Sequence, residues 1–336
     1  MASSAHAAES LEVVIPVRGA LPWIRQSLSS IAAQTQAPSV VTVVNDGAEN
    51  IETISRSGAE LFGARFRLLP NRGRGISAAL NTAIQNCSAR WIARMDADDV
   101  AHPDRFEKQV DFLAGRPDEV LGCGSQVRFM NASGKFLACS RLLESWQAIT
   151  GRLRAQTCFI HPSLMILREA MLATPYRPAL DGAEDVDLVL RLTERGKIVN
   201  LAVALLDYRV HLTQESFRQR ARATAIQELA FRLSLCRLKN RRDPLDENPD
   251  LAEKFIRWRL SSPGYARART ALTALRYAGI NFSGRDFRGL AECLGVALRN
   301  FPTTSAAWHI AWRVYRKAGA ALLDTDTPFE ALNTRS

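Results

Sequence analysis

The chain has 336 residues, of which 47% are hydrophobic and 23% are charged, and its formal net charge is +10 at pH 7. This composition is typical of a soluble globular chain with one large domain and an appendage, or with two domains. It excludes collagen, coiled coil and general disorder. The longest apolar run, Ile198 to Leu206, contains Asn200 and is shorter than the roughly 18 residues of a membrane-spanning helix. We therefore expect no transmembrane segment.

The amino terminus and the cysteines favour a cytoplasmic protein. Residues 1–10, MASSAHAAES, lack the basic start and the apolar stretch of a signal peptide, so we expect a short disordered tail there. The six cysteines are scattered singly with no Cys-x-x-Cys motif, which predicts reduced, small hydrophobic residues and argues against disulfides and a zinc site. They are Cys87, Cys123, Cys139, Cys158, Cys236 and Cys293.

The excess positive charge is concentrated in the last third of the chain. From Met1 to His211 there are 23 Lys and Arg against 22 Asp and Glu, whereas from Leu212 to Ser336 there are 21 against 12. A basic segment of this kind fits nucleic acid, an anionic membrane surface or a phosphorylated substrate. Composition alone does not choose among these partners.

The first hundred residues alternate short strands with helices. Helical spacing of apolar residues predicts a helix over 20–34, and a second helix over 76–86 follows a glycine-rich turn. This alternation predicts an α/β fold with a mixed, mostly parallel sheet flanked by helices. Each strand ends in polar or acidic residues, and strand ends of such a sheet form its ligand crevice. The expected strands are Leu11–Val17, Val40–Asn45, Phe66–Pro70 and Trp91–Met95.

The pattern changes after Asp99. We expect a helix over 102–113, a strand over 120–130 followed by a hairpin-like turn at 131–134, and a helix over 183–196 that ends at a glycine. Beyond Thr213 the strand pattern stops. A C-terminal helical region is expected, with prolines and glycines between its helices. These helices are expected over 214–240, 250–260, 263–278, 284–299 and 303–322.

The segment Asp96-Ala-Asp98-Asp99 places three carboxylates within four residues at the end of an apolar strand. Crowded carboxylates repel one another and raise each other's pKa values unless a cation lies among them. Oxygen ligands of this kind, together with phosphate oxygens, usually hold Mg²⁺ or Mn²⁺. The alternative interpretation is a solvated turn with helix-capping aspartates before Pro103.

A second acidic segment, Gly182 to Arg191, begins an apolar helix with Glu184, Asp185 and Asp187. The helix dipole favours carboxylates in a first turn, which is a sufficient structural explanation for Glu184 and Asp187. A carboxylate held there beside a nucleotide could instead serve as a general base toward a hydroxyl group.

Two further features have ordinary structural alternatives. Gly73-Arg-Gly75-Ile-Ser-Ala78 matches the dinucleotide pattern G-x-G-x-x-A, with Asp96 about twenty residues later. The match is weak, because this motif normally follows the first strand of its domain. His161 and His211 each stand alone in the sequence, and a lone histidine is more often a structural hydrogen-bonding residue than a ligand.

In their order along the chain, these segments resemble the family 2 glycosyltransferases of the GT-A fold, which are inverting enzymes that use nucleotide sugars. The resemblance covers residues 11–216, which implies a catalytic domain over that range and a basic helical region over 217–336. The segments that carry it are Val14–Val17, Val44–Gly47, Asn71–Gly73 with Asn81, Asp96–Asp99, His161–Ser163, Glu184–Asp185, and Tyr208–His211 with Ser216.

The resemblance implies a role for each matched residue. Asp98 and His211 would hold Mn²⁺ or Mg²⁺, and Asp185 would be the catalytic base of a single, inverting displacement. His161 and Glu184 would lie on the acceptor side. The UDP- or dTDP-linked donor would contact Pro16, Asp46, Asn71, Gly73 and Asp96.

The family's usual acceptors are glycans or polyprenyl-diphosphate-linked sugars of polysaccharide and lipopolysaccharide assembly, and the resemblance implies the same here. Two positions depart from the family pattern, because Asn45 replaces an aspartate and Arg18 stands where another residue type is usual. These departures keep a second hypothesis open, a non-catalytic scaffold or nucleotide-sugar binding module of the same fold.

The end of the basic region has an amphipathic pattern. Trp308, Trp312 and Tyr315 share one helix face, with Arg313, Arg316 and Lys317 nearby. The rings could pack on neighbouring helices. They could also meet anionic lipid and place the protein peripherally on the inner face of the cell membrane. We expect no nucleic-acid partner, because basic and aromatic residues do not interleave on a strand-borne surface.

Overall fold

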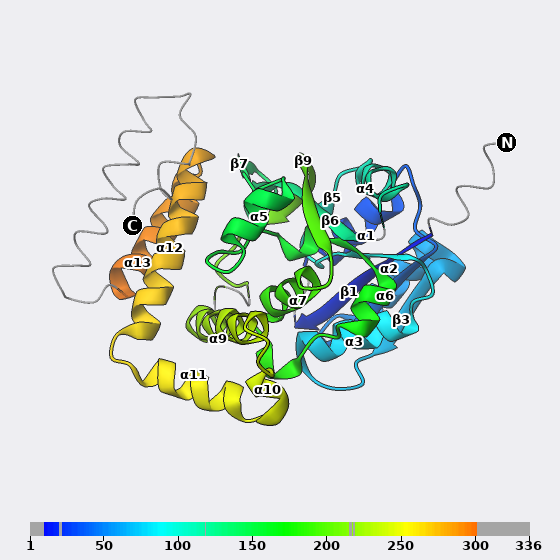
Figure 1. Cartoon of the computed structure of the whole chain (residues 1–336). Helices are drawn as coiled ribbons and strands as arrows, with labels where there is room; N and C mark the ends of the chain where they lie inside the picture. Colours follow the sequence, from blue (N-terminus) through cyan, green and yellow to red (C-terminus); the bar gives the residue numbers. More distant parts are fainter. Residues whose placement is uncertain (1–9, 20–21, 118, 215–216, 218, 301–336) are drawn as a thin grey trace.

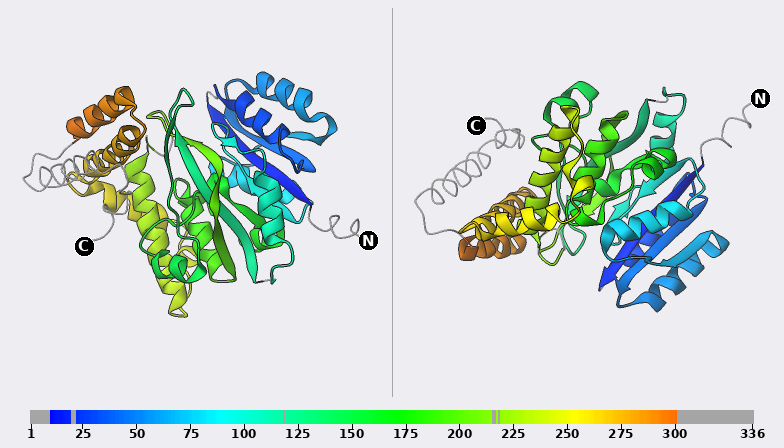
Figure 2. Two further views of the ribbon diagram at one scale, coloured as in Figure 1. Left: turned by 90° about the horizontal axis from the view of Figure 1, so that it is seen from above. Right: turned by 60° about the horizontal axis from the view of Figure 1, so that its bottom comes forward.

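The computed structural model describes residues 10–19, 22–117, 119–214, 217 and 219–300 (Figure 1). Helices cover a central twisted sheet, and a group of C-terminal helices packs beside it (Figure 2). The fold is therefore the mixed α/β architecture that the sequence predicts, followed by helices. The predicted tail at residues 1–9 and the expected helix over 303–322 lie outside the described residues.

The first half of the sheet is parallel. β1 (Leu11–Gly19) lies between β2 (Val40–Ala48) and β4 (Trp91–Arg94), and β3 (Phe66–Pro70) pairs with β2 at the edge. All three pairings are parallel, so the carboxyl ends of these strands lie at one edge. The connecting helices are α1 (Ile24–Ala32), α2 (Ile51–Phe62) and α3 (Gly75–Asn86).

The second half of the sheet is mixed. β8 (Met165–Leu167) runs antiparallel to β4 and to β6 (Val120–Met130), and β6 runs parallel to β9 (Lys197–Arg209). The short β5 (Val100–Ala101) pairs with β9, and β7 (Phe136–Cys139) forms the expected hairpin with β6. The strand order is β3-β2-β1-β4-β8-β6-β9-β5. In this order the end of β9, at residue 209, lies next to the carboxylates that follow β4.

Further helices flank the sheet or extend the chain beyond it. A short helical turn at Gly63–Arg65 follows α2, and similar turns occupy His161–Ser163 and Pro178–Leu180. Beside the sheet lie α4 (Arg105–Leu113), α5 (Trp146–Arg152), α6 (Arg168–Ala173) and α7 (Glu184–Thr193). The C-terminal helices are α9 (Arg220–Leu238), α10 (Pro244–Glu247), α11 (Leu251–Ser261), α12 (Tyr265–Ser283) and α13 (Phe287–Asn300).

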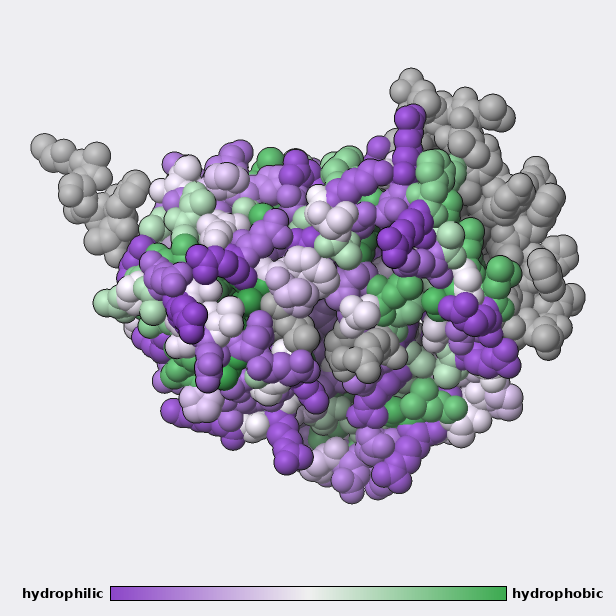
Figure 3. All heavy atoms as spheres, turned by 180° about the vertical axis from the view of Figure 1, so that it is seen from behind, coloured by the Kyte–Doolittle hydropathy of each residue, from purple (hydrophilic) through white to green (hydrophobic). Residues whose placement is uncertain are grey.

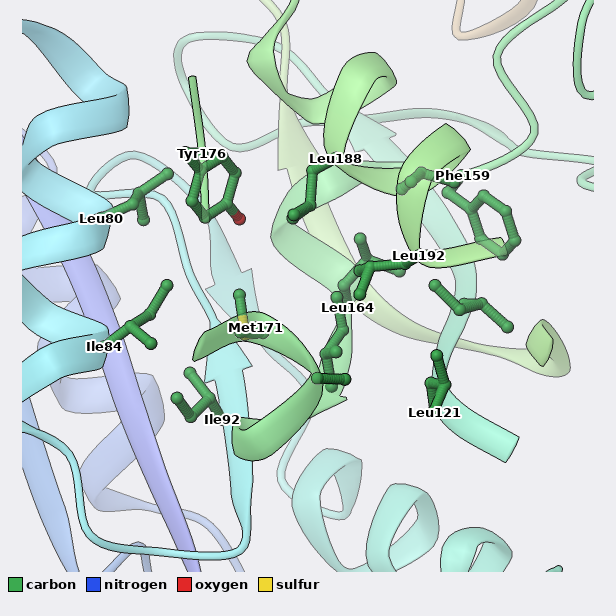
Figure 4. Close-up of a cluster of buried hydrophobic side chains, with 14 of the residues drawn as sticks. Leu80, Ile84, Ile92, Leu121, Phe159, Leu164, Met171, Tyr176, Leu188 and Leu192 are labelled. Carbon is green, nitrogen blue, oxygen red and sulfur yellow. The ribbon is translucent and has the colours of Figure 1, made fainter. Parts of the chain in front are cut away.

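Two apolar clusters cover the two faces of the sheet. One joins β1, β2 and β4 to α1, α2 and α4, and the other joins them to α3, α5, α6 and α7. In the second cluster, Leu80 and Ile84 of α3 and Leu188 and Leu192 of α7 point toward a common core (Figure 4). A fully buried side chain of this kind contributes about 1.5–3 kcal/mol. The core therefore fixes where α7, and the acids at its start, lie relative to the sheet.

A network of charged residues fastens the C-terminal helices to α7. Asp187, whose side chain is fully buried, pairs with Arg177 and with Arg191 at 2.9 Å. Arg177 also pairs with Asp243 at 2.9 Å, and Arg237 of α9 contacts the same carboxylate at 2.6 Å. Removing one partner of a buried pair leaves an uncompensated charge, so this network makes α9 and α10 part of the domain's structure.

The solvent-exposed face drawn in Figure 3 mixes polar side chains with smaller apolar areas. Among the described residues, no helix is both long enough and apolar enough to cross a membrane. The C-terminal helices expose several large apolar side chains, namely Leu235, Leu238, Trp258, Leu260, Leu272, Phe287, Leu294 and Leu298.

Candidate active site

The ends of β2 and β3 and the start of α3 meet at Asp46. Its Oδ1 accepts hydrogen bonds from Asn71 Nδ2 at 2.7 Å and from the backbone N–H of Gly75 at 3.2 Å. Asn71 Oδ1 in turn accepts from the N–H of Gly73 at 3.1 Å. The structure thus brings together three predicted nucleotide-contacting residues, and Pro16 lies half-buried in the neighbouring strand β1, opposite Val44.

The two departures from the family pattern have local explanations. Asn45 Oδ1 accepts from the N–H groups of Gly47 at 3.0 Å and Ala48 at 2.8 Å, which shapes the turn that presents Asp46. Arg18 is 72% exposed and lies 3.8 Å from Asp46, a distance typical of a weak surface pair. Neither residue displaces Asp46 from the site.

The apparent dinucleotide motif has a packing role. Gly75 adopts φ +84°, and Asp181 Oδ2 lies where its Cβ would be, so only glycine fits. Asp181 Oδ1 also accepts from the N–H of Ser77 at 3.1 Å. Asp46 and Asp181 therefore occupy the start of α3, where a dinucleotide-binding fold would place a phosphate. Sequence reasoning missed Asp181, which only the fold brings to this helix.

The three aspartates after β4 form a compact cluster. Asp96, Asp98 and Asp99 each offer a carboxylate oxygen, and these oxygens lie within 4.8 Å of one another. Asp99 is fully buried; its Oδ1 accepts from the N–H of Arg209 at 2.9 Å, while Oδ2 has no hydrogen bond among the described residues. Burial and the charges of Asp98 and Asp96 raise the pKa of Asp99 well above its usual value. An unsatisfied buried oxygen in an all-carboxylate set fits a hard divalent cation.

His211 lies beside this cluster. Its Nε2 is 3.2 Å from Asp98 Oδ2, and its Nδ1 is 2.7 Å from the hydroxyl of Thr213. The ring also lies against Trp23, with centroids 4.8 Å apart. The segment is anchored by Arg209, whose Nε donates to the backbone carbonyl of Asp98 at 2.8 Å. The structure therefore brings together the predicted metal residues Asp98 and His211, which lie 113 residues apart in the chain, while Ser216 lies outside the described residues.

Arg94 connects the aspartate cluster with the start of α7. It is nearly fully buried, and its Nη1 lies 2.5 Å from Asp96 Oδ2. Burial raises the pKa of Asp185, and the charge of Arg94 partly offsets that rise. Burial and the charge of Arg94 both lower the pKa of His161. No role was assigned to this arginine from the sequence. The available signal was an ionised residue inside a strand that is otherwise apolar, which requires a partner nearby.

The first turn of α7 holds two buried carboxyl groups with different surroundings. Asp185 Oδ1 accepts from the N–H of Val186 at 2.8 Å, and burial raises the pKa of Asp185. Glu184 Oε2 accepts from the N–H of Gly182 at 2.8 Å. Burial and the charge of Asp185 raise the pKa of Glu184 to about 8. Near neutral pH, Glu184 is thus largely protonated, whereas at Asp185 the charge of Arg94 opposes the rise in pKa that burial causes.

A narrow cavity opens next to Asp185. His161 lines it together with Phe159, Val186 and Val189. His161 Nε2 lies 2.7 Å from the hydroxyl of Tyr176, and burial lowers the pKa of His161 well below its usual value, so the ring is neutral. Of the two predicted acceptor-side residues, His161 therefore lines the same cavity as the predicted base Asp185, whereas Glu184 does not line it.

Sequence comparison identifies the family. The profile described as "Glycosyl transferase family 2" matches residues 12–173. The matched part of the chain is a family 2 glycosyltransferase domain. Two curated bacterial glycosyltransferases are similar to this one. The O-antigen biosynthesis glycosyltransferase WbnJ of Escherichia coli is 29% identical over 208 residues, 60% of this chain and 80% of WbnJ. The amylovoran biosynthesis glycosyltransferase AmsE of Erwinia amylovora is 28% identical over 191 residues, 55% of this chain and 70% of AmsE.

Solved structures confirm the fold of this glycosyltransferase. The mannosyltransferase PcManGT from Pyrobaculum calidifontis, in complex with GDP-Man and Mn²⁺, has a TM-score of 0.52 at 16% identity. The match covers 94% of this chain and 88% of PcManGT. The predicted GT-A fold is thus confirmed, and the family profile and the two relatives confirm a glycosyltransferase. The dinucleotide-binding interpretation of Gly73 to Ala78 is set aside.

Proposed function

We propose that this glycosyltransferase transfers a sugar from a UDP- or dTDP-linked donor to a hydroxyl group, with inversion and with a divalent metal ion. The observation that carries the proposal is the position of Arg94 between two acidic sites. On one side are Asp96, Asp98 and His211, and on the other is Asp185 beside its cavity. This arrangement would supply a diphosphate site and a base close to each other.

The donor diphosphate would lie at the aspartate cluster. Asp98 and His211 would hold Mn²⁺ or Mg²⁺, and Asp96 would lie on the ribose and metal side. When bound, the ion supplies Lewis-acid neutralisation of the charge that develops on the departing diphosphate. Mn²⁺ in the PcManGT complex, which has the same fold, supports this part of the proposal.

The nucleoside would lie along the edge formed by the ends of β1 to β3. Pro16, Asp46, Asn71 and Gly73 lie there, and Asp46 already accepts two N–H groups. A nucleobase that donates hydrogen bonds would find acceptor oxygens at this edge. The donor proposal rests on this chemistry and on the family's use of nucleotide sugars.

Asp185 would accept the proton of the acceptor hydroxyl group. Burial raises its pKa toward neutral pH, and the positive charge of Arg94 favours its ionised form. One base is enough for a single in-line displacement, which inverts the anomeric centre, whereas a glycosidase needs two carboxyl groups. His161 and Glu184, on the acceptor side, would shape the cavity without taking the proton.

The acceptor would be a glycan intermediate of polysaccharide or lipopolysaccharide assembly, free or linked to polyprenyl diphosphate. The names of WbnJ and AmsE, which refer to O-antigen and amylovoran biosynthesis, support this class. A lipid-linked acceptor would place the enzyme in the cytoplasm, peripherally on the inner membrane face. Flotation with anionic vesicles at low salt tests this, and no association would favour a soluble acceptor. The aromatic and basic residues expected to bind lipid, Trp308 to Lys317, lie outside the described residues.

A screen of nucleotide sugars tests the proposal. The purified full chain is incubated with UDP- and dTDP-sugars and Mn²⁺, and release of the nucleoside diphosphate is measured. We expect release with one donor class only, and only when metal is present. The competing hypothesis, a scaffold that does not catalyse transfer, predicts donor binding without turnover across all donors and acceptors.

A further inference from the structure

One side of α13 carries an exposed apolar stripe. Cys293 of this helix is buried against α12, where Asn281 Nδ2 lies 3.7 Å from its sulfur. At about 100° per residue, three other apolar side chains fall within about 40° of one another on a different face. They are Phe287, Leu294 and Leu298, which are 66%, 40% and 65% exposed, and we call them the α13 stripe. Apolar side chains exposed together in this way mark a surface that binds a protein or a membrane.

The turn between α12 and α13 brings the hairpin of β6 and β7 to one end of this stripe. Lys135 Nζ of the hairpin donates to the backbone carbonyl of Arg285 at 3.0 Å. A Cβ at Gly284 would lie 2.5 Å from Leu137 Cα, so the turn lies directly against β7. The upper end of α12 accordingly lies beside β7 in Figure 1. Phe136, between these two hairpin residues, is 51% exposed. The hairpin therefore adds a second exposed phenylalanine next to the start of α13.

Basic side chains outnumber acidic ones at this surface. Five exposed basic residues lie on α13 or in contact with its ends, namely Lys135, Arg267, Arg285, Arg288 and Arg299. Two acids lie among them. Glu292 pairs with Arg288 at 3.2 Å, and Asp286 is partly buried and accepts a hydrogen bond from the hairpin at 2.6 Å. An excess of positive charge beside exposed apolar side chains is complementary to a bilayer with anionic headgroups.

Asn131 of the hairpin connects this surface with the proposed metal site. Its side chain donates to the turn between α12 and α13 at 2.6 Å, and its backbone carbonyl accepts from Arg209 Nη1 at 3.2 Å. The next carbonyl, that of Ala132, accepts from Trp23 Nε1 at 3.1 Å. The Trp23 ring in turn lies against His211. The same hairpin thus contacts both the exposed surface and the residues around His211.

We propose that the α13 stripe, together with Phe136 and the adjoining basic side chains, is the surface by which this enzyme binds an anionic lipid bilayer. This inference rests on the proposed function, because a lipid-linked acceptor has to be reached at a membrane. The apolar side chains would enter the boundary between headgroups and acyl chains, while the basic side chains would meet the anionic headgroups. The hairpin would then hold the proposed metal site close to the lipid surface that supplies the acceptor.

Flotation of the full chain with vesicles tests this surface. Vesicles of phosphatidylglycerol and phosphatidylcholine are compared with phosphatidylcholine alone, at low and at high salt. We expect binding to the anionic vesicles at low salt. Phe287→Ser and Leu298→Ser should each lower the bound-to-free ratio about fivefold or more, because an apolar side chain no longer enters the interface. Phe287→Trp keeps an apolar ring and should retain the binding. These variants leave Trp308 to Lys317 unchanged, so a loss of binding belongs to the stripe.

Leu238→Ser is the matched control. Leu238 is 49% exposed and ends α9, next to Arg237, which pairs with Asp243 and not with α13. UDP affinity with Mn²⁺ is measured for every variant and should not change.

Three results would overturn the inference. The first is no binding of the unmodified chain to anionic vesicles at low salt. The second is binding that Phe287→Ser and Leu298→Ser leave intact, or that Leu238→Ser reduces equally. The third is a dimer of the unmodified chain that Phe287→Ser dissociates without lipid, which would assign the stripe to a second copy of the chain. Failure of UDP to bind the unmodified chain would instead count against the proposed donor site.

Discussion

His211 Nε2 lies 3.2 Å from Asp98 Oδ2, although 113 residues separate the two in the chain. β9 makes this contact possible, because it runs beside β6 and ends next to the loop after β4. Two potential metal ligands of different chemistry thus meet at the aspartate cluster. The contact gives the proposed metal site its one nitrogen donor.

Replacing His211 by alanine should weaken Mn²⁺-dependent UDP binding about tenfold, because one ligand or diphosphate contact is lost while the carboxylates remain. Calorimetry with and without Mn²⁺ measures this. Thr213→Val is the control, since Thr213 contacts only the other ring nitrogen of His211. An unchanged metal dependence in His211→Ala would remove His211 from the site and leave its contact with Asp98 as a structural one.

Asp185→Asn should reduce turnover about 10²–10⁴-fold, which is the usual contribution of a positioned base, and leave donor binding nearly intact. Glu184→Gln should reduce turnover less, because Glu184 is already largely protonated near neutral pH. Steady-state kinetics and UDP calorimetry measure the two effects. Equal losses in both variants, or an altered circular dichroism spectrum of Asp185→Asn, would point to a structural role for the first turn of α7.

Arg94 should set the acidic limb of the pH–rate profile. Turnover needs ionised Asp185, so it falls as the pH drops through the pKa of this carboxyl group. The charge of Arg94 lowers that pKa, so Arg94→Gln should raise it and move the acidic limb to higher pH. Arg94→Lys should shift the limb less, and Arg90→Gln, an exposed position nearby, should not shift it. A profile unaffected by Arg94→Gln would separate Arg94 from the base.

Asp187→Asn should destabilise the fold by about 3–5 kcal/mol, because it leaves Arg177 and Arg191 without their buried partner. Urea unfolding measures the free energy of unfolding. Asp246→Asn is the matched control: its carboxylate lies 3.8 Å from Arg177 but is 73% exposed, so we expect a change within about 0.5 kcal/mol. A similar loss of unfolding free energy in the two variants would show that burial of the network does not determine how much it stabilises the fold.

Much of the fold can be predicted from the local spacing of apolar residues in the sequence. The first four strands and the long C-terminal helices α9, α11, α12 and α13 lie close to where apolar spacing predicts them, whereas the short helix α10 was not predicted. β9 was not predicted, although its apolar run was noted, because periodicity alone does not distinguish a buried strand from a helix. Asn200 interrupts that run, and in the structure its amide donates to the backbone carbonyls of Leu143 and Cys158.

α2 was missed for a different reason. Its sequence contains two serines and Gly58, which lower helix propensity. A Cβ at Gly58 would lie 2.2 Å from the ring of Phe66, so tertiary packing requires the glycine. Local propensity therefore underestimates a helix whose sequence is adapted to a neighbouring strand.

Some residues of the candidate site can likewise be predicted from local sequence, and others cannot. Residues in acidic or glycine-containing segments, such as Asp98 and Asp185, can be found from sequence because their spacing carries chemical meaning. Arg94 and Asp181 cannot be found in this way, since each acts on a residue distant in the chain, Asp185 and Ser77 respectively. The one available sequence signal was a charged residue inside an apolar strand, which requires a partner nearby, and this signal applied only to Arg94.

The most direct test of the account is the affinity of Asp98→Ala for UDP, measured by calorimetry with and without Mn²⁺. Asp104→Ala, which removes a half-exposed carboxylate at the start of α4, is the control. We expect Mn²⁺ to increase UDP affinity in the unmodified chain and in Asp104→Ala, and to have no effect in Asp98→Ala. Unchanged Mn²⁺-dependent affinity in Asp98→Ala would contradict the assignment of the aspartate cluster as the metal and diphosphate site.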